Sequence, residues 1–190
     1  NHKGVQAISF TGGTATGKII AQKTAASFKK LSLEMGGKNP AIIFPDCDYK
    51  KMLDTVVQSS FSNQGQICLS SSRILIQTEI FKQFKKDFIG KVAELIVGDP
   101  QNIGSDLGAV SSENHFEKIM NYIALAEKEG GKILWGGKAV KLNGRCKKGW
   151  FIKPTIIEGL TNAAKTNQEE IFGPVVTLIP FDNEEDAIQI

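Results

Sequence analysis

The hydrophobic and polar positions of the chain follow two alternating periods. Short runs of β-branched and aliphatic residues, such as residues 41–44 and 73–77, have the composition of buried strands. Between such runs, apolar residues recur every three or four positions, which is typical of amphipathic helices. This alternation predicts an α/β domain whose parallel strands are covered by helices.

The elements can be placed along the chain from these patterns. Strands are expected at residues 5–10, 31–34, 41–44, 73–77, 133–135, 151–157 and 175–180. Helices are expected at about residues 18–28, from about 48 to the Asn63 region, from 80 to the turn at 98–100, and from 116 to Gly130. The first helix should bury Ile20, Thr24 and Phe28 on one face. Residues 138–148 are basic and polar and are expected to form a surface excursion.

Cys68 stands directly after the second predicted helix. Asn63 and Gly65 end that helix, which leaves the cysteine on a connection between two packed elements. A cysteine on a loop that a rigid scaffold supports can meet a substrate. Backbone N–H groups and nearby amides could stabilise a thiolate or an oxyanion, and these amides belong to Asn63, Gln64 and Gln66. The alternative is a small core residue without chemistry.

A glycine-rich loop separates the first strand from the first helix. Its residues are Gly12, Gly13, Thr14, Ala15, Thr16 and Gly17. With Lys18 they match the first seven positions of a nucleotide-triphosphate P-loop, but Ile19 stands where a hydroxyl must reach magnesium, which argues against an ATPase. Two interpretations stay open. The backbone N–H groups approach a dinucleotide phosphate, or the glycines only provide a turn with positive φ.

Two acidic positions are further candidates. Glu34 ends a short strand just before Gly36 and Gly37, where open α/β sheets gather ligands, so its carboxylate could act as a general base on water. The segment 169–174 offers Glu170 to hydroxyl groups and Phe172 to a flat ring. The alternatives are a solvated or ion-paired glutamate at position 34 and an acidic turn with a buried phenylalanine at 169–174.

Composition and charge exclude several classes of function. With 190 residues, 41% of them hydrophobic, and a net charge of only +3 spread over scattered lysines, the chain gives no support for nucleic-acid binding. No apolar run approaches membrane-spanning length. The three cysteines, Cys47, Cys68 and Cys146, lie at unrelated spacings, which predicts neither disulfides nor a zinc site and fits a reducing, cytoplasmic location. The first residues contain neither a signal peptide nor a start methionine, so the chain is expected to begin inside a longer protein.

Together these stretches resemble one family. Residues 10–17, 33–40, 61–68 and 169–174 are similar, in order and spacing, to four signatures of the NAD(P)-dependent aldehyde dehydrogenase superfamily. The resemblance implies that Cys68 is the nucleophile, Glu34 the general base, and Gly12 to Gly17 the cofactor loop. It also implies that Glu170 binds the nicotinamide ribose and that Phe172 contacts the ring. Two departures are Gly13 in place of a common serine and Met35 in place of the usual leucine.

The resemblance implies further expectations. The cofactor is NAD, or else NADP, the partner is a small-molecule aldehyde, and the full-length protein is a homodimer or homotetramer. The stretches Lys30-Leu-Ser-Leu-Glu and Asn39-Pro-Ala-Ile-Ile-Phe resemble the semialdehyde and retinal type, with 2-aminomuconic semialdehyde as an example substrate. Residues 1–33 would be the end of a Rossmann-like cofactor domain, and residues 34–190 most of a catalytic domain. The alternatives are an inactive fragment, an assembly domain on the same fold, or a cofactor-free thiol esterase.

Overall fold

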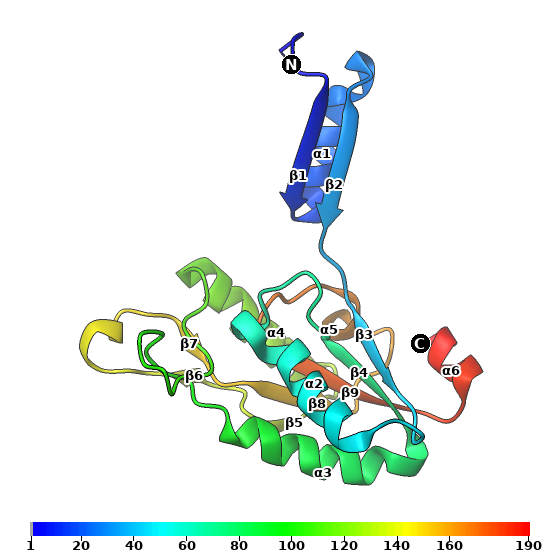
Figure 1. Ribbon diagram of the computed structural model, residues 1–190, viewed down its shortest axis with the longest axis vertical. Helices are drawn as coiled ribbons and strands as arrows, with labels where there is room; N and C mark the ends of the chain where they lie inside the picture. Colours follow the sequence, from blue (N-terminus) through cyan, green and yellow to red (C-terminus); the bar gives the residue numbers. More distant parts are fainter. Residues whose placement is uncertain (1) are drawn as a thin grey trace. The chain divides into compact units, whose positions relative to one another are not determined.

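The computed structural model describes residues 2–190 and divides into two compact units, Asn1–Gly37 and Lys38–Ile190 (Figure 1). The predicted domain boundary after residue 33 falls inside β2 (Lys30–Met35), so the structural division lies a few residues later. Glu34 therefore belongs to the first unit. The roles expected for the two parts stay predictions at this point.

The first unit is one strand–helix–strand motif. Strands β1 (Ala7–Gly12) and β2 pair in parallel, with Thr11 opposite Glu34, and α1 (Thr14–Thr24) connects them. The expected helix over residues 18–28 is wrong at both ends. Gly13 has an extended backbone and caps the helix, so most of the glycine stretch is its first turn, and α1 gives way to a 3-10 turn at Ala25–Ser27. Phe28 then takes a positive φ of 50° and is exposed, not packed.

The second unit contains a five-stranded sheet in the order β3-β4-β9-β8-β5. The strands are β3 (Pro40–Ile43), β4 (Arg73–Gln77), β9 (Val175–Phe181), β8 (Thr155–Glu158) and β5 (Lys132–Trp135). All neighbours pair in parallel except β5, which runs antiparallel to β8 at one edge. The predicted α/β class with a mainly parallel sheet is confirmed, and the antiparallel edge strand was not predicted.

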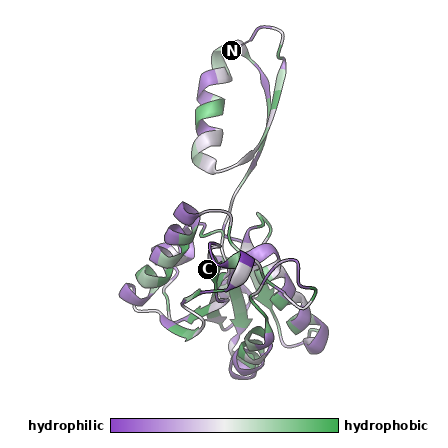
Figure 2. Ribbon diagram, turned by 90° about the vertical axis from the view of Figure 1, so that its left-hand side faces the viewer, coloured by the Kyte–Doolittle hydropathy of each residue, from purple (hydrophilic) through white to green (hydrophobic). Residues whose placement is uncertain are grey.

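Helices cover both faces of this sheet, which is why its central strands are continuous apolar runs. The helices are α2 (Tyr49–Phe61), α3 (Thr78–Glu94), α4 (Glu113–Lys128), α5 (Lys165–Gln168) and α6 (Glu184–Gln189). In β4, Ile74 and Ile76 pack in the core with α2 and α3, whereas Leu75 packs with Ala187 of α6. In Figure 2 the hydrophobic colour gathers on the strands and the hydrophilic colour on the outer sides of the helices.

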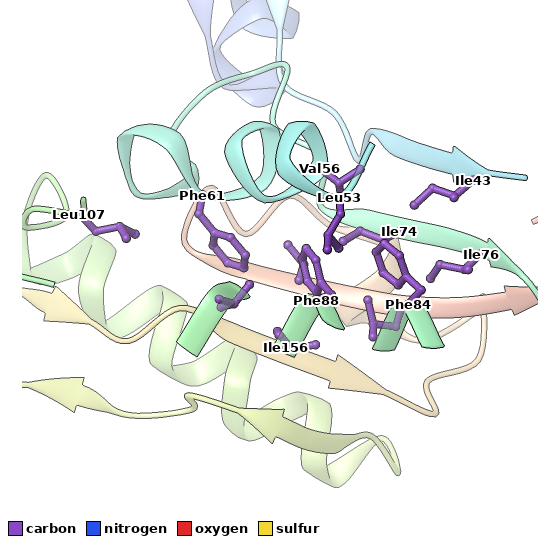
Figure 3. Close-up of a cluster of buried hydrophobic side chains, with 13 residues drawn as sticks. Ile43, Leu53, Val56, Phe61, Ile74, Ile76, Phe84, Phe88, Leu107 and Ile156 are labelled. Carbon is purple, nitrogen blue, oxygen red and sulfur yellow. The ribbon is translucent and has the colours of Figure 1, made fainter. Parts of the chain in front are cut away.

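The core between the sheet, α2 and α3 positions the end of α2. Phe84 and Phe88 of α3 are fully buried and stack with ring centroids 5.2 Å apart, and Phe61 packs on Phe88 (Figure 3). The predicted apolar face of α2 is confirmed, with Leu53 and Val56 also buried. The last helical residue before the cysteine stretch is thus anchored in the core.

The other elements differ from the sequence expectations in three places. The run 151–157 is not one strand, because Pro154 lacks an N–H and the chain changes sheets there, from β7 (Phe151–Ile152), paired with β6 (Ala139–Val140), to β8. Helix α3 ends at Glu94, before the turn at 98–100, because Leu95 is extended. The short helices α5 and α6 were not predicted. Among the described residues, no helix is long and apolar enough to cross a membrane.

Candidate active site

Cys68 lies at the corner of a tight turn. The N–H of Ser70 donates to the carbonyl oxygen of Ile67 at 3.0 Å, which closes a β-turn with Cys68 and Leu69 at its two central positions. Cys68 is exposed, and Leu69 is 78% exposed although it is apolar. The predicted placement of the cysteine on a loop between a helix and a strand is confirmed.

The preceding residues form a second turn that the backbone adopts at some cost. Asn63, Gln64 and Gly65 have positive φ values of 51°, 58° and 67°. Asn63 Nδ2 donates to the carbonyl of Gln66 at 3.1 Å, and Gln66 accepts at Oε1 from the N–H of Ser111 at 3.0 Å. The amides of Asn63 and Gln66 therefore bind the loop and its neighbour, and their expected role toward an anion at the sulfur stays a prediction.

Asn39 is a contact of the cysteine turn that sequence reasoning missed. Its side-chain Nδ2 donates to the carbonyl oxygens of Cys68, at 2.5 Å, and Ser70, at 3.3 Å. Its own carbonyl accepts from the N–H groups of Ser72 and Arg73 at 3.1 and 3.2 Å. Asn39 thus binds four residues between the cysteine and the start of β4.

The segment 169–174 lies against α4, and one side of that helix binds it. His115 Nε2–H donates to the carbonyl of Phe172 at 2.6 Å, and Lys118 Nζ donates to the carbonyl of Glu170 at 2.9 Å. About two helical turns after His115, the Tyr122 hydroxyl donates to the Glu169 carboxylate. This hydrogen bond lowers the pKa of Glu169, and burial together with Glu169 raises the pKa of Tyr122 to about 12.

The cysteine stretch and the 169–174 segment meet at two glycines. A Cβ atom on Gly65 would lie 2.3 Å from the carbonyl oxygen of Gly173, and a Cβ on Gly173 would lie 2.5 Å from Ile119 Cδ1. Only glycine fits at either position, because contacts under about 3 Å force atoms to shift. The structure therefore brings the predicted nucleophile's loop and the predicted cofactor segment together.

Lys38 is a second residue that the sequence did not single out. Its Nζ is buried and has no hydrogen-bond partner among the described residues. Burial, followed by the positive charge of Arg73, lowers the pKa of Lys38 to about 8, and Glu170 opposes the shift. A lysine with a pKa this low changes charge near physiological pH.

In the first unit, the glycine stretch and Glu34 share the carboxyl edge of the parallel strand pair. Thr11 lies opposite Glu34 and Gly12 opposite Met35. Gly17 is buried under Met35, and a Cβ there would lie 2.4 Å from the Met35 sulfur. No described side chain caps the first turn of α1. The N–H groups of Thr16 and Gly17 donate to the Gly13 carbonyl, so those of Thr14 and Ala15 are the ones that can meet an anion. Glu34 is exposed at this edge.

A cavity of about 280 Å³ lies beside the cysteine turn. Ile67 and Leu69, which flank Cys68, line it together with the α2 residues Thr55, Gln58 and Ser59 and with Ser62 and Ser70. The surface that these residues present to the cavity is mostly apolar. Cys68 itself is not part of the lining, although both of its sequence neighbours are.

Proteins of known activity resemble this chain over its whole length. The aldehyde dehydrogenase family model matches residues 1–190. The 2-aminomuconic semialdehyde dehydrogenase of Bos taurus is 45% identical over 191 residues, and the 5-carboxymethyl-2-hydroxymuconate semialdehyde dehydrogenase of Escherichia coli is 42% identical. Each alignment covers 100% of this chain but only 39% and 40% of the respective relative.

A solved structure agrees with the sequence relatives. Betaine aldehyde dehydrogenase from Staphylococcus aureus, in complex with NAD+, superposes with a TM-score of 0.93 at 38% identity, over 100% of this chain and 37% of that chain. The predicted resemblance is confirmed. With its family model matched from the first residue to the last, the chain belongs to the aldehyde dehydrogenase family.

Proposed function

We propose that this chain carries the reactive centre of an enzyme that oxidises an aldehyde to a carboxylic acid with NAD. The observation that supports this most is the junction of Gly65 with Gly173, which joins the turn of an exposed cysteine to the segment of Glu170 and Phe172. Nucleophile and cofactor contacts must be adjacent if a carbon bound to the sulfur is to lose hydride.

The first step belongs to Cys68. Its thiolate adds to the aldehyde carbon, a C–S bond forms, and the carbonyl π electrons move to oxygen to give the anion of a thiohemiacetal. Cys68 lies on a turn, so its own N–H can donate to that oxygen. The cavity beside it would hold the rest of the aldehyde, and its mostly apolar surface suits the carbon chain of such a substrate.

The residues present fit a dinucleotide. The uncapped N–H groups at the start of α1 suit the pyrophosphate, and the space beside Gly13 is open within 4 Å of a Cβ position. Glu170 would bind the nicotinamide ribose hydroxyls, and Phe172 would contact the ring. When bound, NAD supplies the acceptor for the hydride that leaves the thiohemiacetal carbon, and a thioester remains on Cys68.

Glu34 acts in the last step. As a general base it takes a proton from water, the hydroxide oxygen adds to the thioester carbon, and the C–S bond breaks to release a carboxylic acid and regenerate the thiolate. Its place at the carboxyl edge of β2, exposed beside the glycine stretch, supports this role. Residues 1–33 would then complete a cofactor domain, and residues 34–190 would form most of a catalytic domain.

The names of the relatives support a proposal for the substrate class. Two of them are named for semialdehydes, and we extend that class to this chain, with 2-aminomuconic semialdehyde as the first compound to test. NADP is the alternative cofactor, since residues that distinguish the two lie outside the motifs present here. A cytoplasmic homodimer or homotetramer is the proposed form of the full-length protein.

Replacing each cysteine in the natural full-length protein tests the proposal. Cys68→Ser should abolish NADH formation from aldehydes, because a serine hydroxyl is a far weaker nucleophile at neutral pH. Cys47→Ser and Cys146→Ser are the matched controls and should retain activity. Activity that survives Cys68→Ser would overturn the assignment. Hydrolysis of p-nitrophenyl acetate without NADH formation would instead indicate a thiol esterase, and absence of both NAD binding and activity an assembly domain.

A further inference from the structure

Asn39 connects the start of β3 to the cysteine turn through the hydrogen bonds of its side-chain amide. It precedes Pro40, and proline keeps the residue before it extended. In β3 and β4, Pro40 lies opposite Arg73, so Asn39 faces the end of the segment that follows Cys68. From there its amide reaches back along the segment to the carbonyl oxygens of Ser70 and Cys68.

Asn39 contacts the central peptide of the turn, which is the peptide whose orientation differs between turn types. In a β-turn, the peptide between the two central residues distinguishes type I from type II, and type II requires a positive φ at the second of them. Here that peptide joins Cys68 to Leu69, and Leu69 is not among the residues with positive φ. A donor at the Cys68 carbonyl therefore stabilises the orientation that the structure shows.

The orientation of this peptide matters for chemistry at the sulfur. A trans peptide has its C=O and N–H on opposite sides, so with the carbonyl turned to Asn39 the N–H of Leu69 faces away. A rotated peptide would place a carbonyl oxygen where that N–H now lies. Near a thiolate or a developing oxyanion, the oxygen would repel negative charge instead of stabilising it.

We propose that Asn39 is a positioning residue for Cys68, which fixes the Cys68–Leu69 peptide through the hydrogen bond to the Cys68 carbonyl. This inference rests on the proposed role of Cys68 and adds a residue that acts through it. The side chain must offer two N–H donors to two carbonyl oxygens. An aspartate of the same shape offers none when ionised, so Asn39→Asp removes the donors and adds a negative charge, whereas Asn39→Ala removes the donors without adding a charge.

The test compares Asn39→Asp and Asn39→Ala in the natural full-length protein. We expect the rate of the first NADH burst to fall about 100-fold in both, as for a misplacement of about 1 Å, with the NAD dissociation constant unchanged. Iodoacetamide labelling of Cys68, the reporter that needs no cofactor, should slow in both variants. The control is Asn183→Ala, which removes a side-chain hydrogen bond to the N–H of Asp186 at the start of α6 and should alter neither reading.

Protonation separates positioning from general damage. A protonated aspartate regains one donor, so the deficit of Asn39→Asp in labelling rate should shrink between about pH 7 and about pH 4, where an ordinary aspartate becomes protonated, whereas that of Asn39→Ala should stay constant. Equal deficits at both pH values, or burst and labelling rates within about twofold of the unchanged protein, would overturn the inference. If Cys68→Ser also retained activity, the proposed function itself would have failed. If Cys68→Ser lost activity while the Asn39 variants kept it, only the positioning role of Asn39 would be rejected.

Discussion

The backbones of Gly65 and Gly173 touch, since a Cβ atom on Gly65 would lie 2.3 Å from the carbonyl oxygen of Gly173. These residues are far apart in the sequence, in the cysteine stretch and in the segment of Glu170 and Phe172. The contact fixes the distance between the two loops without any side chain. Its geometry gives the first prediction.

Gly65→Ala should be much more destabilising than its backbone angle alone explains. Gly65 and Gly144 have nearly the same positive φ, 67° and 63°, but a Cβ on Gly144 meets nothing within 4 Å. Gly144→Ala should therefore cost only the left-handed penalty of about 1–2 kcal/mol. Gly65→Ala should add the overlap with Gly173, a further 1–3 kcal/mol or so. Urea denaturation of both variants measures the difference, and equal costs would show that the loops separate without strain.

Glu34→Gln should separate the two chemical steps in the full-length protein. The acylation of Cys68 and hydride transfer do not need the base, so a burst of NADH close to one equivalent should remain. Steady-state turnover should fall by roughly 100- to 10,000-fold, the usual contribution of a general base. Rapid-quench measurement with saturating NAD and aldehyde distinguishes the outcomes. Full turnover would remove Glu34 from the mechanism, and loss of the burst would mean that it also activates Cys68.

Lys38→Met should stabilise the protein at neutral pH. The pKa of Lys38 falls from 10.5 to about 8 on folding, which corresponds to roughly 3 kcal/mol against the folded state when the unfolded lysine is protonated. This penalty is complete below about pH 8 and disappears as pH rises towards 10.5. The unchanged protein should therefore gain stability over that range, and the Met variant should not.

The control for Lys38 is Lys82→Met at an exposed position of α3, which should alter stability little at any pH. Urea midpoints at about pH 7 and about pH 10 are sufficient, because the predicted advantage of Lys38→Met lies between these values. An advantage of the same size at both would place its origin in packing and not in the buried charge.

Tyr122→Phe should make the 169–174 segment less sensitive to acid. The hydrogen bond from the Tyr122 hydroxyl lowers the pKa of Glu169 in the folded protein. The stabilisation from this hydrogen bond is therefore present above the pKa of an unfolded glutamate, and it is lost as the pH falls through the pKa of folded Glu169. The two proteins should differ most near neutral pH and converge in acid. Thermal melting across that range measures the difference, and a constant gap would contradict the ionic origin.

The sequence was sufficient to predict the elements whose patterns are local. The apolar face of α2 and the run of β4 are repeats within a few residues, and both are present. The start of α1 was predicted too late, because glycines favour loops in isolation, whereas here Gly17 lies inside the helix and packs against the Met35 side chain. The break at Pro154 was not predicted, because it depends on the different strands with which the segments before and after the proline pair.

The site was predictable only as a set of separate motifs. Cys68 and Glu170 follow from the resemblance, but the roles of Asn39 and Gly65 depend on partners distant along the chain. Both lie inside the recognised stretches, so an amide just before a proline and a glycine beside two left-handed residues were the available signals. Lys38 carries no such signal, since only its burial distinguishes it from the other lysines.

Helix α4 holds the 169–174 segment at Glu170 and Phe172 by their main-chain carbonyls, which every amino acid possesses. Exchanging either side chain therefore leaves these two anchors in place. The helix determines where the segment runs. Under the proposed function, substitutions at these two positions could then change cofactor preference without disturbing the main-chain framework that presents them.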